Sequence, residues 1–274
     1  MTCAVSGGAD STALLILAVA AGCVVTAVHV DHGLRAGSAA EADVVARTAT
    51  RFGAQFRAER AFIGAGPNLE ARARAARAAV LPSDAFTGHT ADDHAETVLL
   101  NLLRGSGLDG VRGVGRAERR PLLRLRRAET VALCAAADAE VVVDPTNADP
   151  AFTRNRVRHE VLPLLAEVMR RDPVPMLCRF ADLAGDESAL LDELALEVEP
   201  TDCAALARVP APLARRALRS WMRSEFDGYA PDAAAIERAL AVARGEAVGA
   251  DIASGVSVRR TAGRLRIERA AGDR

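Results

Sequence analysis

The stretch Ala4-Val5-Ser6-Gly7-Gly8-Ala9-Asp10-Ser11-Thr12, followed by the apolar run 13–21, decides the fold of this chain. A short apolar segment, two adjacent glycines, hydroxyl side chains and an Ala/Leu-rich run predict a strand, a tight turn and a helix. Glycine backbones let successive N–H groups converge on an oxyanion, and the start of the following helix adds free amides and a positive dipole end. We therefore expect this turn to bind phosphate.

Two common phosphate-binding patterns do not fit the turn. The Walker loop ends in Gly-Lys-Ser/Thr, whereas this chain has no lysine and all 35 of its Lys+Arg residues are arginine. The dinucleotide fingerprint Gly-x-Gly-x-x-Gly does not fit either. The turn instead resembles the Ser-Gly-Gly-x-Asp-Ser pyrophosphate loop (PP-loop) of enzymes that split ATP into AMP and pyrophosphate. That resemblance implies that ATP phosphates bind at Ser6, Gly7, Gly8, Ala9, Asp10 and Ser11.

Length, composition and charge bound the class of protein. A chain of 274 residues suffices for one large domain, or for a medium domain with a smaller companion. No run is long and apolar enough to span a bilayer and no signal peptide precedes the first motif, so we expect a soluble, cytoplasmic protein without a membrane partner. The five cysteines form no Cys-x-x-Cys pair, which disfavours zinc, iron–sulfur and redox dithiol sites. The net charge of −1 means that any polyanion site needs local clustering.

Short apolar segments alternate with helical patterns through the first 165 residues. Strands are predicted at 2–5, 24–30, 55–60, 84–88 and 140–143, and helices at 13–21, 38–52, 69–77 and 91–103. This alternation is typical of the α/β class with a doubly wound parallel sheet. Ligands in such folds bind at the carboxyl ends of strands, where Ser6, Asp31 and His89 are expected.

The pattern beyond Pro163 is purely helical until the last segment. Helices are predicted at 177–198, 213–226 and 233–244, and 255–268 alternates like a β-hairpin. We therefore expect a PP-loop ATP pyrophosphatase domain at 1–165 and a smaller helical accessory domain at 166–274 that ends in the hairpin.

A second cluster, His89-Thr90-Ala91-Asp92-Asp93-His94-Ala95-Glu96, opens a predicted helix. Glu96 follows Asp92 by four residues and Asp93 by three, so at least two carboxylates share one face. Capping of the positive helix end is one explanation for them. The other is that Asp10 and Asp93 hold Mg²⁺ against the ATP phosphates, because Mg²⁺ prefers one or two carboxylates together with phosphate oxygens and water. His89 lies on the same edge as the phosphate loop, which favours a site residue over a core histidine.

Two arginine-rich segments flank the predicted strand 140–143. The first, 109–129, has seven arginines against three carboxylates, and the second, 152–159, has three arginines. A run of charge is often a solvated face, and it is also the local clustering that nucleic acid needs. Because aromatic residues make up only 3% of the chain, an RNA base would stack on arginine rather than on a tyrosine platform.

Taken in order, the motifs are similar to those of the tRNA(Ile)-lysidine synthase family, in its short type, within the PP-loop ATP pyrophosphatases. The resemblance covers residues 3 to about 165, and the helical remainder is similar in character only. The stretches that carry it are Ser6-Gly7-Gly8-Ala9-Asp10-Ser11, Val30-Asp31-His32-Gly33-Leu34-Arg35, Leu69-Glu70-Ala71-Arg72-x-Arg74-x-x-Arg77, His89-x-x-Asp92-Asp93-x-x-Glu96-Thr97, Leu102-Leu103-Arg104-Gly105-Ser106-Gly107-Leu108, Arg120-Pro121-Leu122-Leu123, Asp144-Pro145-Thr146-Asn147 and Arg154-Asn155-x-x-Arg158.

The resemblance implies an ATP-dependent ligase that modifies tRNA. In that family, ATP activates the C2 oxygen of the wobble cytidine of a tRNA(Ile) with a CAU anticodon, and pyrophosphate is released. The amine of free lysine then displaces AMP, which gives lysidine. The partners implied are therefore ATP with Mg²⁺, this tRNA and free L-lysine, while the sequence leaves open whether the protein forms a homodimer.

The resemblance also implies roles for individual residues. Asp10 and Asp93 would be metal-binding or catalytic carboxylates, with His89 and Glu96 as neighbours. Arg74 and Arg77 would bind the phosphates or the adenylated intermediate. By their position at the end of a predicted strand, Asp31 and His32 are either part of a strand-ending turn or contacts to adenine or ribose. Contacts to tRNA are expected from Arg104, Arg116, Arg119, Arg120, Arg154 and Arg158.

The chain departs from the family pattern in three places. A helix usually precedes the first strand, which here starts at about Thr2; Ala78 stands where an aromatic residue often follows Arg77; and the additional carboxyl-terminal domain of longer members is not expected. Two rival functions remain. A tRNA thiolation enzyme of the same superfamily would need cysteines to deliver sulfur, and a nucleotide-binding sensor would have no use for the acidic helix start or the arginine segments.

Overall fold

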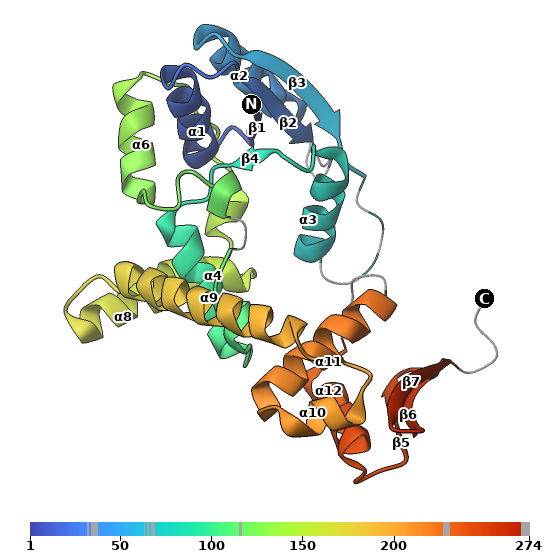
Figure 1. Ribbon diagram of the computed structural model, residues 1–274. Helices are drawn as coiled ribbons and strands as arrows, with labels where there is room; N and C mark the ends of the chain where they lie inside the picture. The colour runs from blue at the N-terminus through green and yellow to red at the C-terminus, as the bar shows by residue number, and fades with distance from the viewer. Residues whose placement is uncertain are drawn as a thin grey trace. The chain divides into compact units, whose positions relative to one another are not determined.

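The computed structural model describes residues 1–31, 33, 38–62, 64, 66, 69–114, 117–226 and 231–269. The chain folds into two compact units, Met1–Leu183 and Ala184–Arg274, and each is described by itself (Figure 1). The junction falls within one long helix, α9 (Val174–Leu196). The division into domains at 165/166 remains a prediction from the sequence.

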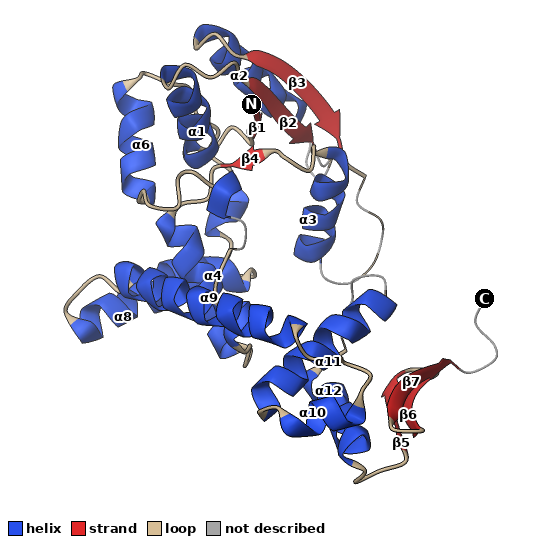
Figure 2. Cartoon of the chain, in the orientation of Figure 1, coloured by secondary structure: helices blue, strands red, loops and turns tan. Residues whose placement is uncertain are grey.

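The first unit is built on a four-stranded parallel sheet. Its strands are β1 (Thr2–Ala4), β2 (Thr26–Asp31), β3 (Gln55–Arg60) and β4 (Phe86–Thr87), in the order β3-β2-β1-β4 (Figure 2). In the centre of the sheet Cys3 of β1 pairs with Ala27 on one side and Phe86 on the other. The predicted doubly wound α/β class is confirmed, and the carboxyl ends of β1, β2 and β4 lie at one edge.

Helices flank this sheet and bury its apolar side chains. The longer ones are α1 (Ala9–Ala20), α2 (Ser38–Arg51), α3 (Leu69–Val80), α4 (Ala91–Leu103) and α6 (Arg127–Ala136). One core cluster joins α1, α2 and α6 to the central strands through Leu14, Leu15, Val45 and Cys134. Figure 1 shows α1 and α6 side by side. The shorter elements are α5 (Leu108–Val111), η1 (Ala117–Arg119), η2 (Pro145–Ala148), α7 (Thr153–Arg156), a π-helical turn η3 (Val157–Val161) and α8 (Leu162–Met169).

The strand predicted at 140–143 does not form. These residues are irregular, and their backbone joins the phosphate loop through one hydrogen bond, from Val142 N to Gly7 O at 2.9 Å. A β-branched run favours an extended backbone, but the segment becomes a strand of the sheet only where a neighbouring strand lies in position to pair with it. Here Val142 packs over Gly7, where a Cβ would lie 2.7 Å from Val142 Cγ2.

In its described residues the second unit combines the end of α9 with three further helices and an antiparallel sheet. The helices are α10 (Cys203–Arg208), α11 (Ala211–Glu225) and α12 (Ala233–Arg244), and the strands are β5 (Gly249–Ala253), β6 (Val256–Thr261) and β7 (Arg264–Arg269). Its core contains Leu206, Leu218, Met222, Ile236, Leu240, Val258 and Leu265. The predicted helical C-terminal region is confirmed, and β6–β7 is the predicted hairpin, turning at Ala262-Gly263 with positive φ at both residues.

Strand β5 was not predicted. Its sequence, Gly249-Ala250-Asp251-Ile252-Ala253, lacks β-branched and aromatic side chains apart from Ile252, which is its one buried residue.

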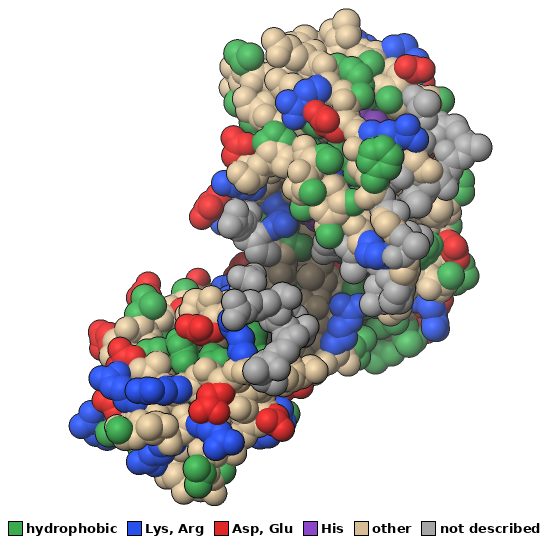
Figure 3. Space-filling view, turned by 90° about the vertical axis from the view of Figure 1, so that its right-hand side faces the viewer, with side chains coloured by type: hydrophobic (Ala, Val, Ile, Leu, Met, Phe, Trp, Pro, Cys, Tyr) green, Lys and Arg blue, Asp and Glu red, His purple; other side chains and the backbone are tan. Residues whose placement is uncertain are grey.

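Acidic and basic side chains are interspersed on the lower part of the surface in Figure 3, which belongs to this unit. No described helix is long and apolar enough to cross a membrane.

Candidate functional site

The phosphate loop connects β1 to α1. Ser11 holds the loop closed, because its Oγ accepts from Ser6 N at 3.1 Å and donates to Gly8 O at 2.9 Å. Gly7 has φ +91°, a conformation that disfavours any L side chain. Helix α1 begins at Ala9 and is 12 residues long, so its free amides and positive dipole end face the loop. The predicted strand, turn and helix are therefore present, and the loop has the geometry of an anion site.

Helix α4 starts beside this loop. Gly88, between β4 and α4, lies against the first turn of α1: a Cβ built on Gly88 would be 2.5 Å from Asp10 O. The Asp93 Oδ2 atom accepts from both Thr90 N and Thr90 Oγ1 at 3.0 Å, which caps the helix and fixes the carboxylate. Its other oxygen is left for contacts across the site. The capping interpretation of the acidic helix start is therefore confirmed for Asp93, whereas a role of Asp93 in binding Mg²⁺ remains a prediction.

Glu96 is a fully buried carboxylate of the site. Its side chain is 0% exposed, and its carboxylate accepts from Arg154 Nε at 2.7 Å and from Arg158 Nε at 2.7 Å. The same two arginines also reach Asp93 Oδ1, at 3.5 and 3.4 Å. Arg154 and Arg158, predicted as tRNA contacts, thus lie inside the carboxylate cluster. Their contact with tRNA remains a prediction.

Arg127 joins all three carboxylates. Its Nε donates to Asp10 Oδ2 at 3.2 Å, its Nη2 to Asp93 Oδ1 at 2.8 Å and its Nη1 to Glu96 Oε1 at 3.2 Å. Each nitrogen of one guanidinium therefore serves a different carboxylate. Thr130, one turn along α6, donates a further hydrogen bond to Asp10 Oδ1. Neither Arg127 nor Thr130 was assigned a role from the sequence.

The two aspartates differ in acidity. Burial raises the pKa of Asp10 above its ordinary value, although Thr130 and Arg127 oppose the shift. The pKa of Asp93 is lowered despite burial, because the charge of Arg127, the Thr90 backbone and the charge of Arg154 stabilise its ionised form. Asp93 therefore stays ionised to a lower pH than Asp10.

His89 lies at the end of β4 among arginines. Burial, together with the charges of Arg120, Arg77 and Arg154, lowers its pKa to about 4, although Asp93 acts in the opposite direction. Arg120 Nε donates to His89 Nδ1 at 3.4 Å, and the Thr87 hydroxyl lies 2.8 Å from the same nitrogen. With Nδ1 as the acceptor, the neutral ring carries its hydrogen on Nε2 and offers a donor to the site.

The remaining predicted residues are placed less closely. Asp31 ends β2, and its Oδ1 accepts from Gly33 N at 2.8 Å. Arg104 is exposed at the C-terminus of α4. Arg119 lies in η1, and its Nη1 is buried without a hydrogen-bond partner among the described residues. His32, Arg116 and the side chain of Arg74 lie outside the described part of the structure.

The residues of the site fit a divalent cation that binds together with phosphate. Asp10 Oδ2 and Asp93 Oδ1 face one guanidinium, so their charges converge on one small region beside the phosphate loop. No group of three or more described His, Cys, Asp or Glu side chains is arranged to hold a metal ion unaided. Two carboxylates that need phosphate oxygens and water to complete the shell are the donor set that Mg²⁺ prefers.

A hollow of about 200 Å³ borders Glu96 and Arg127. Its polar walls combine three carboxylates with three arginines, and its apolar walls come from the α8 and α9 region. The lining residues include Asp92, Glu96, Arg126, Arg127, Arg158, Asp172, Leu162, Pro163 and Val174. Within it, Arg126 bonds to Asp92 at 2.9 Å and contacts Asp172. Such a mixed lining suits a ligand that carries charges of both signs on an aliphatic stem.

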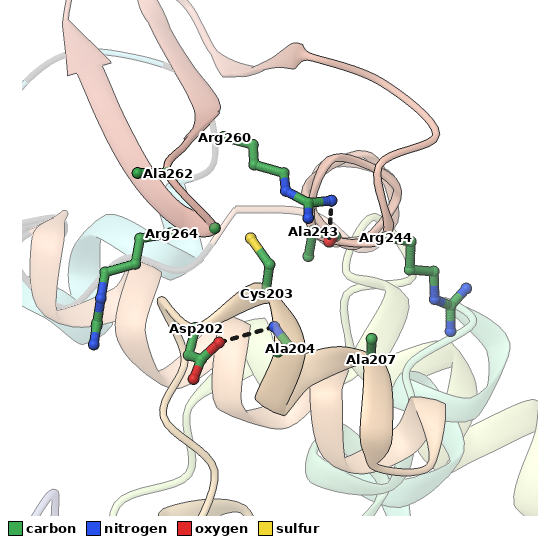
Figure 4. Close-up of a pocket in the computed structure, with 10 residues that line it drawn as sticks. Asp202, Cys203, Ala204, Ala207, Ala243, Arg244, Arg260, Ala262 and Arg264 are labelled. Atoms are coloured by element: carbon green, nitrogen blue, oxygen red, sulfur yellow. Dashed lines mark hydrogen bonds between the residues drawn. The ribbon is translucent and has the colours of Figure 1, made fainter.

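The second unit has a hollow of its own, of about 330 Å³, between α10, the end of α12 and the β6–β7 turn (Figure 4). Small residues, among them Cys203 and Ala207, line it together with Arg244, Arg260 and Arg264. Arg260 donates to Ala243 O at 3.2 Å.

Arg264 donates to Thr201 Oγ1 at 3.2 Å, so neither of these two bonds involves a carboxylate. Asp202, the one acidic residue among the described residues that line the hollow, caps α10 by accepting from Ala204 N at 2.8 Å (Figure 4). The charged side chains of the lining are therefore mostly basic, which suits a phosphate group.

Comparison with known proteins agrees with this geometry. Residues 1–165 match the PP-loop domain, and residues 202–266 match the TilS substrate binding domain. A loop with the geometry of an anion site, beside paired carboxylates at the edge of a parallel sheet, together with the match to the PP-loop domain, defines a PP-loop ATP-binding enzyme.

Curated relatives narrow this class. The tRNA(Ile)-lysidine synthase of Nocardia farcinica is 43% identical over 80% of this chain and 74% of its own length. Those of Streptomyces coelicolor and Corynebacterium glutamicum are each 37% identical, over 86% and 96% of this chain and 74% and 88% of their own lengths. The chain belongs to the tRNA(Ile)-lysidine synthase family.

A solved structure shares the fold. The U34-tRNA thiolase NcsA from Methanococcus maripaludis, described with its [4Fe-4S] cluster, superposes with a TM-score of 0.54 at 17% identity, over 67% of this chain and 72% of that one. At that identity the likeness concerns the fold alone.

Proposed function

We propose that this protein ligates lysine to C2 of the wobble cytidine of tRNA(Ile) with a CAU anticodon. The cytidine C2 oxygen attacks the α phosphorus of ATP and pyrophosphate leaves; the amine of lysine then attacks C2 and AMP leaves. The observation that carries the proposal is the convergence of Asp10 and Asp93 beside the phosphate loop. Mg²⁺ bound there would neutralise phosphate charge and align the triphosphate for in-line attack.

Within this scheme the residues of the chain bind and orient the reactants. The loop amides and the start of α1 hold the phosphates beyond the α phosphorus. His89, a neutral donor at Nε2 with Arg77 and Arg120 around it, is suited to an oxyanion of the adenylated cytidine rather than to accepting the proton of the lysine amine. A carboxylate is the better candidate to take that proton.

We assign the hollow beside Glu96 and Arg127 to free lysine. Its carboxylates match the ammonium groups, its arginines match the α-carboxylate, and Leu162 and Val174 match the aliphatic stem.

Asp172→Asn should raise KM for lysine while ATP-dependent adenylation of tRNA continues. The matched control is Glu167→Gln, an exposed carboxylate on the adjacent α8, which should leave KM unchanged. An unchanged KM in Asp172→Asn would contradict this assignment.

Binding of tRNA is assigned to the arginine-rich segments and to the second unit. Arg104 and Arg119 remain proposed contacts, and the basic hollow at Arg260 and Arg264 would receive a backbone phosphate. The cytoplasm is the proposed location, because tRNA and free lysine are found there.

Thiolation is the less favoured alternative. A thiolate is needed for sulfur delivery, and burial raises the pKa of the Cys3 and Cys178 thiols to about 11. Cys134 is buried and donates to Ala9 O at 3.4 Å.

The decisive experiment combines protein, ATP, isotopically labelled lysine and a tRNA with a CAU anticodon. The label should enter RNA, with one AMP and one pyrophosphate released for each lysine. Asp10→Ala and Asp93→Asn should abolish pyrophosphate release while tRNA binding remains. Label in protein, or pyrophosphate release by both variants at the wild-type rate, would refute the proposal.

A further inference from the structure

Arg127 has an arrangement that the catalytic scheme does not use. The three nitrogens of its guanidinium contact Asp10, Asp93 and Glu96 at 2.8 to 3.2 Å, and its side chain is only 26% exposed. The oxygens that it contacts on the two aspartates are those that converge beside the phosphate loop. The Arg127 guanidinium is therefore a cation of the protein itself that already bridges the proposed metal ligands, Asp10 and Asp93.

The charges around Arg127 balance without a metal. Three carboxylates, Asp10, Asp93 and Glu96, face three guanidinium groups, those of Arg127, Arg154 and Arg158. A divalent ion entering alone would leave two excess positive charges in a largely buried cluster, and like charges at about 4 Å repel by several kcal/mol at an effective dielectric constant of about 20. ATP carries four negative charges, so nucleotide and metal entering together do not meet this barrier.

We propose that Arg127 occupies the cation position between Asp10 and Asp93 until ATP binds, and that the triphosphate then draws the guanidinium off these carboxylates so that the divalent ion replaces it. Arg127 is thus a positioning residue that couples metal binding to nucleotide binding. The inference rests on the proposed metal site.

The reach of Arg127 supports this exchange. Arg127 is the first residue of α6, so the end of its side chain can turn without disturbing the helix. Glu96 keeps Arg154 and Arg158 when Arg127 turns away, at 2.7 Å each, so its buried charge stays paired. The partner that Arg127 gains is the triphosphate, since a guanidinium binds phosphate oxygens in a bidentate manner.

Binding of Mn²⁺ to the full chain, followed by electron paramagnetic resonance of the free ion, tests the inference without activity. In the absence of nucleotide, Arg127→Gln should bind Mn²⁺ at least tenfold more tightly than wild type, because the carboxylates have lost their internal cation. Arg156→Gln is the matched control, since Arg156 pairs with the exposed Glu160 at 2.9 Å. Its Mn²⁺ affinity should equal that of wild type.

The nucleotide arm separates this inference from the proposed function. ATP without tRNA should increase the Mn²⁺ affinity of wild type strongly and that of Arg127→Gln much less. Suppose that wild type binds Mn²⁺ in the presence of ATP, but that Arg127→Gln without nucleotide binds Mn²⁺ no more tightly than wild type without nucleotide. The inference about Arg127 is then wrong, while the proposed metal site is supported. If wild type with ATP binds no Mn²⁺ beyond that bound by ATP itself, both the inference about Arg127 and the proposed metal site are wrong. Should Arg127→Gln not fold, Arg127→Met serves instead, because methionine also removes the internal cation while keeping an unbranched side chain, and a Mn²⁺ affinity above wild type is again expected.

Discussion

Replacing Glu96 by glutamine should destabilise the first unit by about 3 kcal/mol. The Glu96 side chain is fully buried, and its two oxygens accept from Arg127, Arg154 and Arg158. Removing one partner of a buried ion pair costs about 3–5 kcal/mol, since the remaining charge is left uncompensated. These three arginines are 19 to 26% exposed, so water relieves part of the cost and the lower end of the range applies. The amide also places an N–H₂ group against guanidinium donors.

Denaturant unfolding at pH 7, followed by circular dichroism, measures this loss. At roughly 2–4 °C per kcal/mol, the thermal midpoint should fall by about 6–12 °C. Glu160→Gln is the control, because Glu160 pairs with Arg156 on an exposed helical surface and its loss should leave the midpoint unchanged. Salt should not reproduce the effect in wild type, since buried pairs are little screened. If Glu96→Gln unfolds at the same denaturant concentration as Glu160→Gln, the network does not stabilise the unit and the reasoning is wrong.

Three further predictions test other parts of the structure. The pKa of His89 is about 4 in the folded protein against an ordinary value of 6.5, so between these pH values the unfolded chain binds a proton at His89 that the folded protein does not, and the free energy of unfolding falls as pH drops from about 6.5 towards 4. His89→Gln should therefore lose less unfolding free energy between pH 7 and 4.5 than wild type, and an equal loss would contradict the lowered pKa of His89. Gly88→Ala should destabilise by about 1–3 kcal/mol through its clash with the first turn of α1, whereas Gly107→Ala, with open space around the new methyl, should not; equal midpoints in urea would refute this. Arg260→Gln and Arg264→Gln should each weaken tRNA binding and reduce its salt slope by about one unit or less, and unchanged slopes would remove the hollow from the tRNA path.

Much of the first unit followed from local pattern. The phosphate loop, the parallel sheet and the bounds of α4 at Ala91–Leu103 depend on residues that are neighbours in the chain, and periodicity records such relations. The placement of Asp93 opposite Asp10 followed because carboxyl ends of parallel strands share an edge. The assignments of individual site residues remain predictions that the proposed variants test.

The features that sequence did not reveal depend on distant partners. Arg127 stands in a run with Arg124 and Arg126, and charge excess was its only signal; nothing local distinguishes the arginine that turns inward from those that face water. The segment 140–143 is β-branched, yet its partner in the fold is Gly7 and not a strand. In both cases a long-range contact decided between alternatives that propensity treats as equal.

The double attachment of Asp93 has a consequence for how the family can vary. One oxygen of this carboxylate holds the start of α4 through Thr90, while the other meets Arg127 across the site. Asparagine at this position would keep an oxygen for the cap of α4 but lose the charge that meets Arg127. Selection for a well-formed helix and selection for turnover therefore act on the same side chain, and a lineage that lost the activity could exchange this aspartate for asparagine and still keep the start of α4 capped.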